Sequence, residues 1–168
     1  MGFYLNSSES ARLYINEAKK PYFVDKTKML SDLVPLAETG SQYVCITRPR
    51  RFGKTIMANM IGAFFSKGCD APVFDGLQIA GYAGYEKHKN KHNVIYIDFS
   101  KADDECESYR EYITSIKEIL REDLHEEFPD VKYRQKGTVS EDLKRIQEST
   151  GESFIFVFDE WDYIFHQK

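Results

Sequence analysis

Three short apolar runs restrict the fold of this chain more than any other feature of its sequence. They occupy residues 43–46, 94–97 and 154–158. A continuous apolar run of this length, without alternating polar residues, is typical of a strand that is buried on both faces, as in a parallel sheet. The sequence therefore predicts three buried strands in one sheet.

The segments between these runs show the spacing of helices. After Thr55, pairs of apolar residues recur at helical intervals, which predicts a helix that ends at Gly68. Residues 107–128 carry apolar side chains at intervals of three and four, which predicts an amphipathic helix.

Capping signals predict two further helix ends. Thr138 and Glu141 have the spacing of a capping box, so a helix is predicted from there to Gly151. Nearer the N-terminus, Asp25 is predicted to cap a helix that bends or ends near Pro35.

The order strand, helix, strand, helix, helix, strand predicts an α/β fold in which helices flank a parallel sheet in three layers. Right-handed crossovers place the loops that follow parallel strands at one edge of the sheet, where ligands bind. Residues 48–55, Asp98, and the pair Asp159 and Glu160 all stand at the ends of predicted strands. We therefore predict that they converge at that edge.

The first of these loops holds Gly53, Lys54 and Thr55 between a predicted strand and a predicted helix. This is the arrangement of a phosphate-binding loop, because the N–H groups and the dipole at a helix start favour bound phosphate. Gly53 would let the backbone approach the phosphates, Lys54 would reach the β and γ phosphates, and Thr55 would ligate Mg²⁺. An ordinary strand–helix turn with an exposed lysine is the alternative for the tripeptide alone.

The third apolar run ends in Asp159 and Glu160, within FIFVFDE. In phosphate-loop enzymes an aspartate at this place holds Mg²⁺, and a following glutamate polarises the attacking water. A strand end that turns polar is common, but its combination with the loop at Gly53 predicts a nucleotide site. The predicted catalytic residues are Glu160 and Lys54, and the predicted metal ligands are Thr55 and Asp159.

The loop departs from the usual pattern, because Arg48 stands where an opening glycine is expected. An arginine here either binds phosphate, or pairs with a nearby acid or points into solvent, and the sequence leaves both readings open. Proline in the loop stiffens it and removes one N–H donor. The predicted nucleotide-binding residues are Arg48, Pro49, Arg50, Arg51, Phe52, Gly53, Lys54 and Thr55.

Composition excludes several classes of protein. At 168 residues the chain has the length of about one domain, and its net charge of −4 argues against a surface that binds nucleic acid throughout. Cys45, Cys69 and Cys106 lack metal-ligand spacing, which predicts free thiols in a reducing cytoplasm. No apolar run is long enough to span a membrane. His88 and His92 are four residues apart, and no acid or cysteine is placed to complete a metal site with them, so they are predicted to lie in a solvated loop.

Three blocks, YFVDKTKML, ITRPRRFGKT and FIFVFDEWD, resemble the signature blocks of the predicted AAA-ATPase-like family, a group of largely bacterial proteins. The resemblance covers residues 22–165, and in that family an arginine at the position of Arg48 is normal. It implies a P-loop NTPase fold with ATP and Mg²⁺ as ligands, a Walker A motif at RPRRFGKT and a Walker B motif at FIFVFDE. Asp25 falls in the first block, whose role the resemblance does not supply.

The resemblance implies ATP hydrolysis. From it we expect residues 1–168 to form the N-terminal part of a single AAA-ATPase-like domain, truncated after the Walker B strand. Members commonly carry a C-terminal nuclease-like domain, which we expect to be missing here. Sensor and arginine-finger elements come later in such domains, so a non-catalytic nucleotide-sensing or protein-interaction module is an open alternative. Self-association is a further expectation, while the net charge disfavours a third alternative, a nuclease-associated DNA-binding protein.

Overall fold

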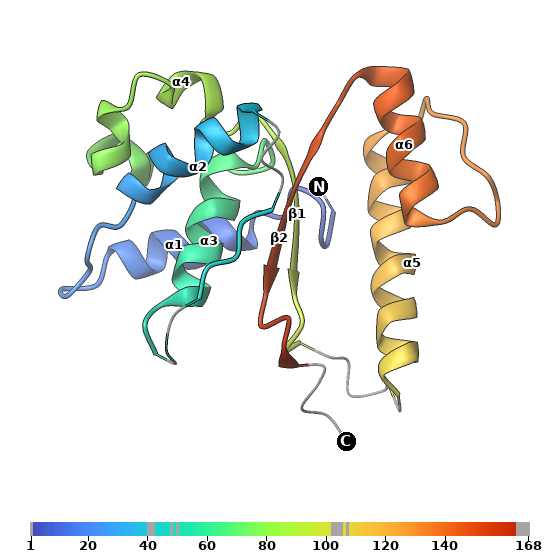
Figure 1. Ribbon diagram of the computed structural model, residues 1–168, viewed down its shortest axis with the longest axis horizontal. Coiled ribbons are helices and arrows are strands. Elements are labelled where there is room, and N and C mark those ends of the chain that lie inside the picture. The colour runs from blue at the N-terminus through green and yellow to red at the C-terminus, as the bar shows by residue number, and fades with distance from the viewer. Residues whose placement is uncertain are drawn as a thin grey trace. The chain divides into compact units, whose positions relative to one another are not determined.

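The computed structural model describes residues 2–39, 43–47, 49, 51–101, 106 and 108–163 (Figure 1). The chain divides into two compact units. We call Met1–Ser7 with Asn93–Lys168 the sheet unit, and Ser8–His92 the helical unit. Each unit is described by itself.

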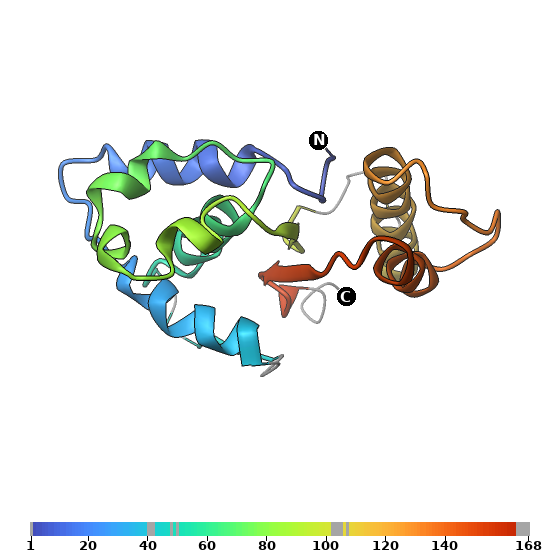
Figure 2. The same cartoon turned by 90° about the horizontal axis from the view of Figure 1, so that it is seen from above.

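The sheet unit contains two parallel strands, β1 (Asn93–Asp98) and β2 (Phe154–Asp159). They pair in register from Asn93 opposite Phe154 to Asp98 opposite Asp159. Between them the chain forms α5 (Tyr109–Glu127) and α6 (Val139–Thr150), which lie side by side in Figures 1 and 2. The structure thus confirms two of the predicted strands, their parallel direction, and the predicted helices between them.

One face of β1 forms the core of the sheet unit with α5 and α6. Residues of the amphipathic stripe of α5 meet alternate residues of β1, as the two periodicities require. The buried members of this core are Leu5, Ile95, Ile97, Tyr112, Ile116, Leu120, Leu124, Val131 and Ile146.

The helices of the sheet unit begin and end at the predicted signals. The Thr138 hydroxyl accepts a hydrogen bond from Glu141 N–H, and the Glu141 carboxylate accepts one from Thr138 N–H, which completes the capping box. Gly151 ends α6 with a φ of 75°, a left-handed conformation that glycine adopts without steric cost.

The N-terminal segment adds to the sheet unit in a way that the sequence did not predict. Leu5 forms an antiparallel bridge with Ile95, and the Asn6 N–H donates to the Val94 carbonyl at 2.8 Å. The carboxylate of Asp123, a buried residue of α5, accepts hydrogen bonds from the N–H groups of Phe3, Tyr4 and Leu5. A carboxylate that accepts several backbone N–H groups fixes the course of a segment with little regular structure.

The helical unit consists of short helices. In chain order they are α1 (Glu9–Ala18), α2 (Lys28–Thr39), α3 (Lys54–Phe65), η1 (Pro72–Gly76), η2 (Gln78–Gly81) and α4 (Tyr85–His88). Helices α1 and α3 pack against each other, and Tyr14 of α1 stacks on Phe74 of η1 with ring centroids 5.2 Å apart. Phe64 of α3 meets the edge of the Phe74 ring, so these three aromatic side chains join the helices.

Two helix ends in this unit differ from the prediction. Helix α3 ends at Phe65, before Gly68, because the next residue, Ser66, is extended and bridges to His92. Helix α2 continues through Pro35 to Thr39, so the predicted possibility of an end near Pro35 is wrong and that of a bend stays open.

The predicted strand at residues 43–46 is wrong: residues 43–47 have no regular structure, and Tyr43 and Val44 are 95% and 51% exposed. A buried central strand needs a partner at each edge for its N–H and C=O groups. Within the described part of the chain only β1 and β2 pair as strands, so this run has no ladder to join.

The prediction that residues 154–158 are buried on both faces is also wrong. Phe156 and Phe158 of β2 are 45% and 52% exposed. In the described residues β2 has one strand neighbour, β1, and the core formed by α5 and α6 covers only part of the strand face. The α/β class is confirmed, and the three-layer P-loop arrangement stays a prediction.

None of the described helices combines the length and the apolar character that crossing a membrane requires.

Candidate functional site

The start of α3 has the geometry of an anion-binding turn. Gly53 is its N-cap residue, with φ 80° and ψ 31°, in the left-handed region. Glycine has no side chain that could cap the helix, so it leaves the positive end of the helix dipole open to an anion. Helix α3 then runs from Lys54 to Phe65, long enough to carry a substantial dipole.

The side chains of the tripeptide lie at the surface. Lys54 is half-buried and Thr55 is exposed, and both belong to the first turn of α3. The sequence prediction that the tripeptide opens a helix is confirmed. Its contact with phosphate stays a prediction.

The loop before Gly53 is exposed and tightly turned. Arg51 has a φ of 66°, and the Phe52 N–H donates to the Pro49 carbonyl at 3.4 Å. Phe52 is 59% exposed, so its ring does not serve the core of the unit. The predicted site residues Arg48 and Arg50 lie outside the described residues.

Lys26 lies beside this loop, a contact that the sequence did not predict. It belongs to the DKT block, which is Asp25, Lys26 and Thr27 within YFVDKTKML. The Nζ atom of Lys26 is 3.5 Å from the Phe52 carbonyl oxygen and donates to it. A Cβ atom placed on Gly53 would lie 3.8 Å from the same Nζ. The only sequence signal was that Asp25, Lys26 and Thr27 form part of a family block.

Asp25 holds that block to another part of the helical unit. Its carboxylate accepts hydrogen bonds from Thr27 N–H at 2.8 Å, from the Thr27 hydroxyl at 2.7 Å and from Gln78 N–H at 2.7 Å. Burial raises the pKa of Asp25, but these hydrogen bonds to its charged form outweigh that effect and lower it below the usual value. Asp25 was predicted to cap a helix, and it instead connects the entrance of α2 to η2.

The acidic pair predicted at the end of the third apolar run lies at the end of β2. Asp159 is 5% exposed, and its Oδ1 atom accepts a hydrogen bond from Glu160 N–H at 3.1 Å. Its Oδ2 atom is buried and has no hydrogen-bond partner among the residues that the structure describes. A buried carboxylate oxygen without a donor is costly unless a cation neutralises it.

The buried Oδ2 atom of Asp159, which has no hydrogen-bond partner among the described residues, fits a ligand of a divalent cation. Carboxylate oxygens are the ligands that Mg²⁺ prefers, and Mg²⁺ in nucleotide sites is held by one or two carboxylates together with phosphate oxygens. The remaining coordination would come from water and from phosphate oxygens.

Asp98 lies opposite Asp159 in the register of the sheet. Its Oδ1 atom accepts hydrogen bonds from the N–H and the hydroxyl of Ser100, at 3.0 and 2.7 Å. The predicted convergence is therefore confirmed for Asp98 and Asp159, because parallel strands bring their carboxyl ends to one edge. The loop at Gly53 belongs to the helical unit, and its place in the same site stays a prediction.

Glu160 follows β2 in a left-handed conformation, with a φ of 49°, and is half-buried. This conformation is uncommon for a residue with a side chain, and such residues are frequent at functional sites. Trp161 and Tyr163, which follow Glu160, are 56% and 38% exposed, so they lie outside the core of the sheet unit.

The prediction that His88 lies in a solvated loop is wrong. His88 is 3% exposed at the end of α4, and its ring stacks on that of His92. Its Nε2 atom lies 3.1 Å from Glu38 Oε1, an acid that the fold brings from α2. Among the described residues, no three potential ligands are arranged to hold a metal ion.

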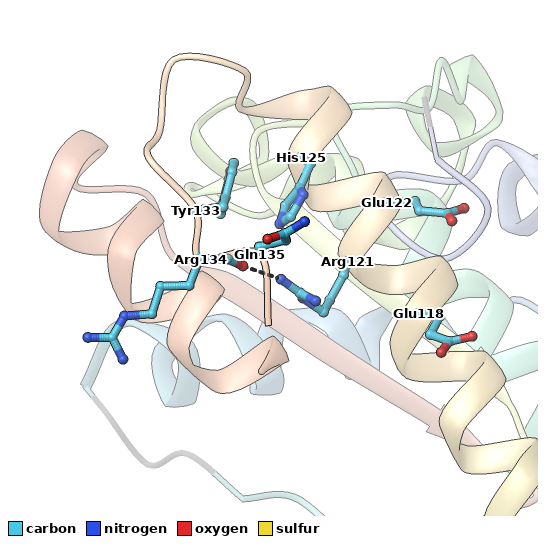
Figure 3. Close-up of a pocket in the computed structure, with 7 residues that line it drawn as sticks. All are labelled: Glu118, Arg121, Glu122, His125, Tyr133, Arg134 and Gln135. Carbon is cyan, nitrogen blue, oxygen red and sulfur yellow. Dashed lines mark hydrogen bonds between the residues drawn. The ribbon is translucent and has the colours of Figure 1, made fainter. Parts of the chain in front are cut away.

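A cavity of about 500 Å³ lies in the sheet unit and contains none of the predicted site residues (Figure 3). The Arg121 Nε atom donates to Asp142 Oδ2 at 2.7 Å, and His125 Nε2 lies 2.8 Å from the same oxygen. Asp142 is fully buried, so its charge holds α5 to α6. Burial, with a smaller effect of the Asp142 charge, raises the pKa of nearby Tyr133 to about 12. The lining residues are Glu118, Arg121, Glu122, His125, Tyr133, Arg134 and Gln135.

The three cysteines, Cys45, Cys69 and Cys106, are free thiols, as their spacing predicted. Burial raises the pKa of the Cys69 thiol, which makes it a poor nucleophile.

Comparison with known proteins assigns the chain to a family. No curated protein and no solved structure matches the chain. The model of a family described as "Predicted AAA-ATPase" matches residues 15–168, a span that contains the DKT block, the loop at Gly53 and the acidic end of β2. The chain therefore belongs to the predicted AAA-ATPase family.

Proposed function

We propose that this protein binds ATP at the start of α3 and hydrolyses it with Mg²⁺. The observation that carries the proposal is the left-handed turn at Gly53, which opens α3 with Lys54 and Thr55 in its first turn. Membership of the predicted AAA-ATPase family supports the same reading. The choice of ATP as the nucleotide rests on the family description.

The residues of the helical unit would bind the phosphates. The N–H groups at the start of α3 donate to phosphate oxygens, and the Lys54 ammonium neutralises charge on the β and γ phosphates. The tight turn at Gly53 allows this approach because no side chain stands between the backbone and the ligand.

The residues at the end of β2 would act on the metal and the water. Asp159 and Thr55 would hold Mg²⁺, which would neutralise negative charge on the phosphates. The Glu160 carboxylate accepts a proton from the attacking water. The water oxygen then forms a bond to the γ phosphorus, the bond between this phosphorus and the bridging oxygen breaks, and ADP leaves.

The first test is nucleotide binding. Titration calorimetry with ATP and Mg²⁺ should show binding by the wild type and a loss of at least roughly tenfold in Lys54→Ala. Lys19→Ala, which removes an exposed lysine of the same unit, is the matched control. Equal affinities for wild type and Lys54→Ala would mean that the tripeptide is only a turn.

The second test separates binding from turnover. Phosphate release under single-turnover conditions should fall by roughly a hundredfold or more in Glu160→Gln, with ATP affinity kept. Glu148→Gln, on the exposed surface of α6, is the control. If the wild type binds ATP and releases no phosphate, the chain is a nucleotide-sensing module rather than an ATPase.

A further inference from the structure

We propose that Lys26 is a second phosphate-binding cation of the nucleotide site, held beside the loop at Gly53 by the hydrogen bonds of Asp25 and Thr27. The inference rests on the proposed function, because it assigns a residue to the same site. It gives a chemical role to the DKT block, and the ligand that it identifies is a polyphosphate.

The position of the ammonium group is the first argument. Lys26 Nζ lies 3.5 Å from the Phe52 carbonyl oxygen, immediately before the turn that opens α3. A Cβ atom on Gly53 would stand 3.8 Å from Nζ, so the ammonium group is adjacent to the backbone that a phosphate would approach. These residues all belong to the helical unit.

The rigidity of the segment is the second argument. The two neighbours of Lys26 are fixed: Thr27 is fully buried, and its hydroxyl accepts a hydrogen bond from Ile79 N–H at 3.1 Å. The Asp25 carboxylate accepts from both Thr27 and Gln78. The backbone of Lys26 is therefore held in place while its side chain remains exposed toward the loop.

The unused charge of Lys26 is the third argument. Three lysines of this unit pair with carboxylates: Lys20 with Glu17, Lys87 with Glu38 and Lys89 with Asp75. In the parts of the unit that the structure describes, Lys26 pairs with no carboxylate, and its hydrogen bond to the Phe52 carbonyl is long. An ammonium group has three donors, so a phosphate oxygen can be added without breaking an ion pair.

A second lysine adds positive charge to a site for a strongly negative ligand. ATP carries several negative charges, and a helix dipole with one lysine neutralises only part of them. Lys54 enters from α3, and Lys26 enters from the segment before α2. Cations from two separate segments would fix the orientation of a bound phosphate as well as neutralise its charge.

The experiment measures affinities of the full chain for Mg–ATP and for inorganic triphosphate with Mg²⁺, by calorimetry. Lys26→Gln should lower the affinity for both ligands by roughly tenfold, because each complex loses one charge-assisted hydrogen bond. Lys26→Arg should keep most of the affinity, because the positive charge remains. Lys28→Gln removes an exposed lysine of the same segment and should change neither affinity.

The salt dependence of binding adds a measurement that would not change if Lys26 had a purely structural role. Because the charge of Lys26 contributes to binding, affinity for triphosphate should fall less steeply with salt in Lys26→Gln than in the wild type. Thermal melting of each variant confirms that it is folded.

Two failures are distinguishable. If the wild type binds neither ligand, the proposed function fails and the role of Lys26 with it. If the wild type binds both and Lys54→Ala loses both, but Lys26→Gln matches the wild type, only the inference on Lys26 is overturned. An unchanged salt slope in Lys26→Gln would also overturn it.

Discussion

Asp98 and Asp159 are register partners, each the last residue of its strand, yet their carboxylates have opposite surroundings. The Asp98 carboxylate accepts two hydrogen bonds from Ser100, while Asp159 has a buried Oδ2 atom without a partner in the described residues. One carboxylate therefore stabilises a turn, and the other costs free energy that a bound cation would recover.

This contrast predicts stability changes of opposite sign. Without Mg²⁺, Asp159→Asn should raise the free energy of unfolding by about 1 kcal/mol, because it removes a buried charge that is only partly satisfied, at Oδ1, by hydrogen bonding. Asp98→Ala should lower it by about 1 kcal/mol through the lost bonds to Ser100. Urea unfolding in EDTA measures both. A loss of stability in Asp159→Asn would show that its carboxylate is satisfied without a metal.

Gly53 and Gly151 make a matched pair for the turn at α3. Both are left-handed, with φ of 80° and 75°, and alanine at either position costs about 1–2 kcal/mol of strain. A Cβ atom would meet nothing closer than 3.7 Å at Gly53 and nothing within 4 Å at Gly151. We expect similar losses of stability in both alanine variants, with nucleotide affinity reduced only in Gly53→Ala. Equal nucleotide affinity in the two variants would contradict a site at α3.

The N-terminal segment should depend on Gly2 and Asp123. A Cβ atom on Gly2 would lie 2.3 Å from Asp123 Cγ, closer than any real contact, so Gly2→Ala must displace the segment or the carboxylate. We expect a loss of about 1–3 kcal/mol in the free energy of unfolding. Gly76→Ala is the control, because a Cβ atom there meets nothing within 4 Å. Hydrogen exchange at Phe3, Tyr4 and Leu5 should accelerate in Asp123→Ala, and unchanged exchange would contradict the anchor.

The lowered pKa of Asp25 predicts the pH dependence of its contribution. A carboxyl group whose pKa is lowered by folding stabilises the folded state fully above its ordinary pKa of 3.8 and loses that contribution as pH falls through the folded value. Wild type should therefore be more stable than Asp25→Asn at neutral pH, and the difference should shrink below about pH 4. Asp32→Asn, on the exposed face of α2, should show no such difference. Denaturant unfolding between pH 2 and pH 7 makes the comparison.

The sequence by itself determined the features that depend on near neighbours in the chain. Helix α6 could be predicted from Thr138 to Gly151 because a capping box and a left-handed glycine are local arrangements of backbone and side chain. The two strands that pair, the amphipathic stripe of α5 and the glycine that opens α3 were predicted for the same reason.

Only the tertiary structure decided which distant groups meet. An apolar run is a strand only if another segment supplies hydrogen-bond partners, and this is why residues 154–158 pair with β1 while residues 43–46 join no strand. The same holds for the donors on Asp123, for Lys26 beside Phe52, and for the different surroundings of Asp98 and Asp159. No local period encodes these contacts, because their free energy arises from burial and hydrogen bonding between segments that are far apart in the chain.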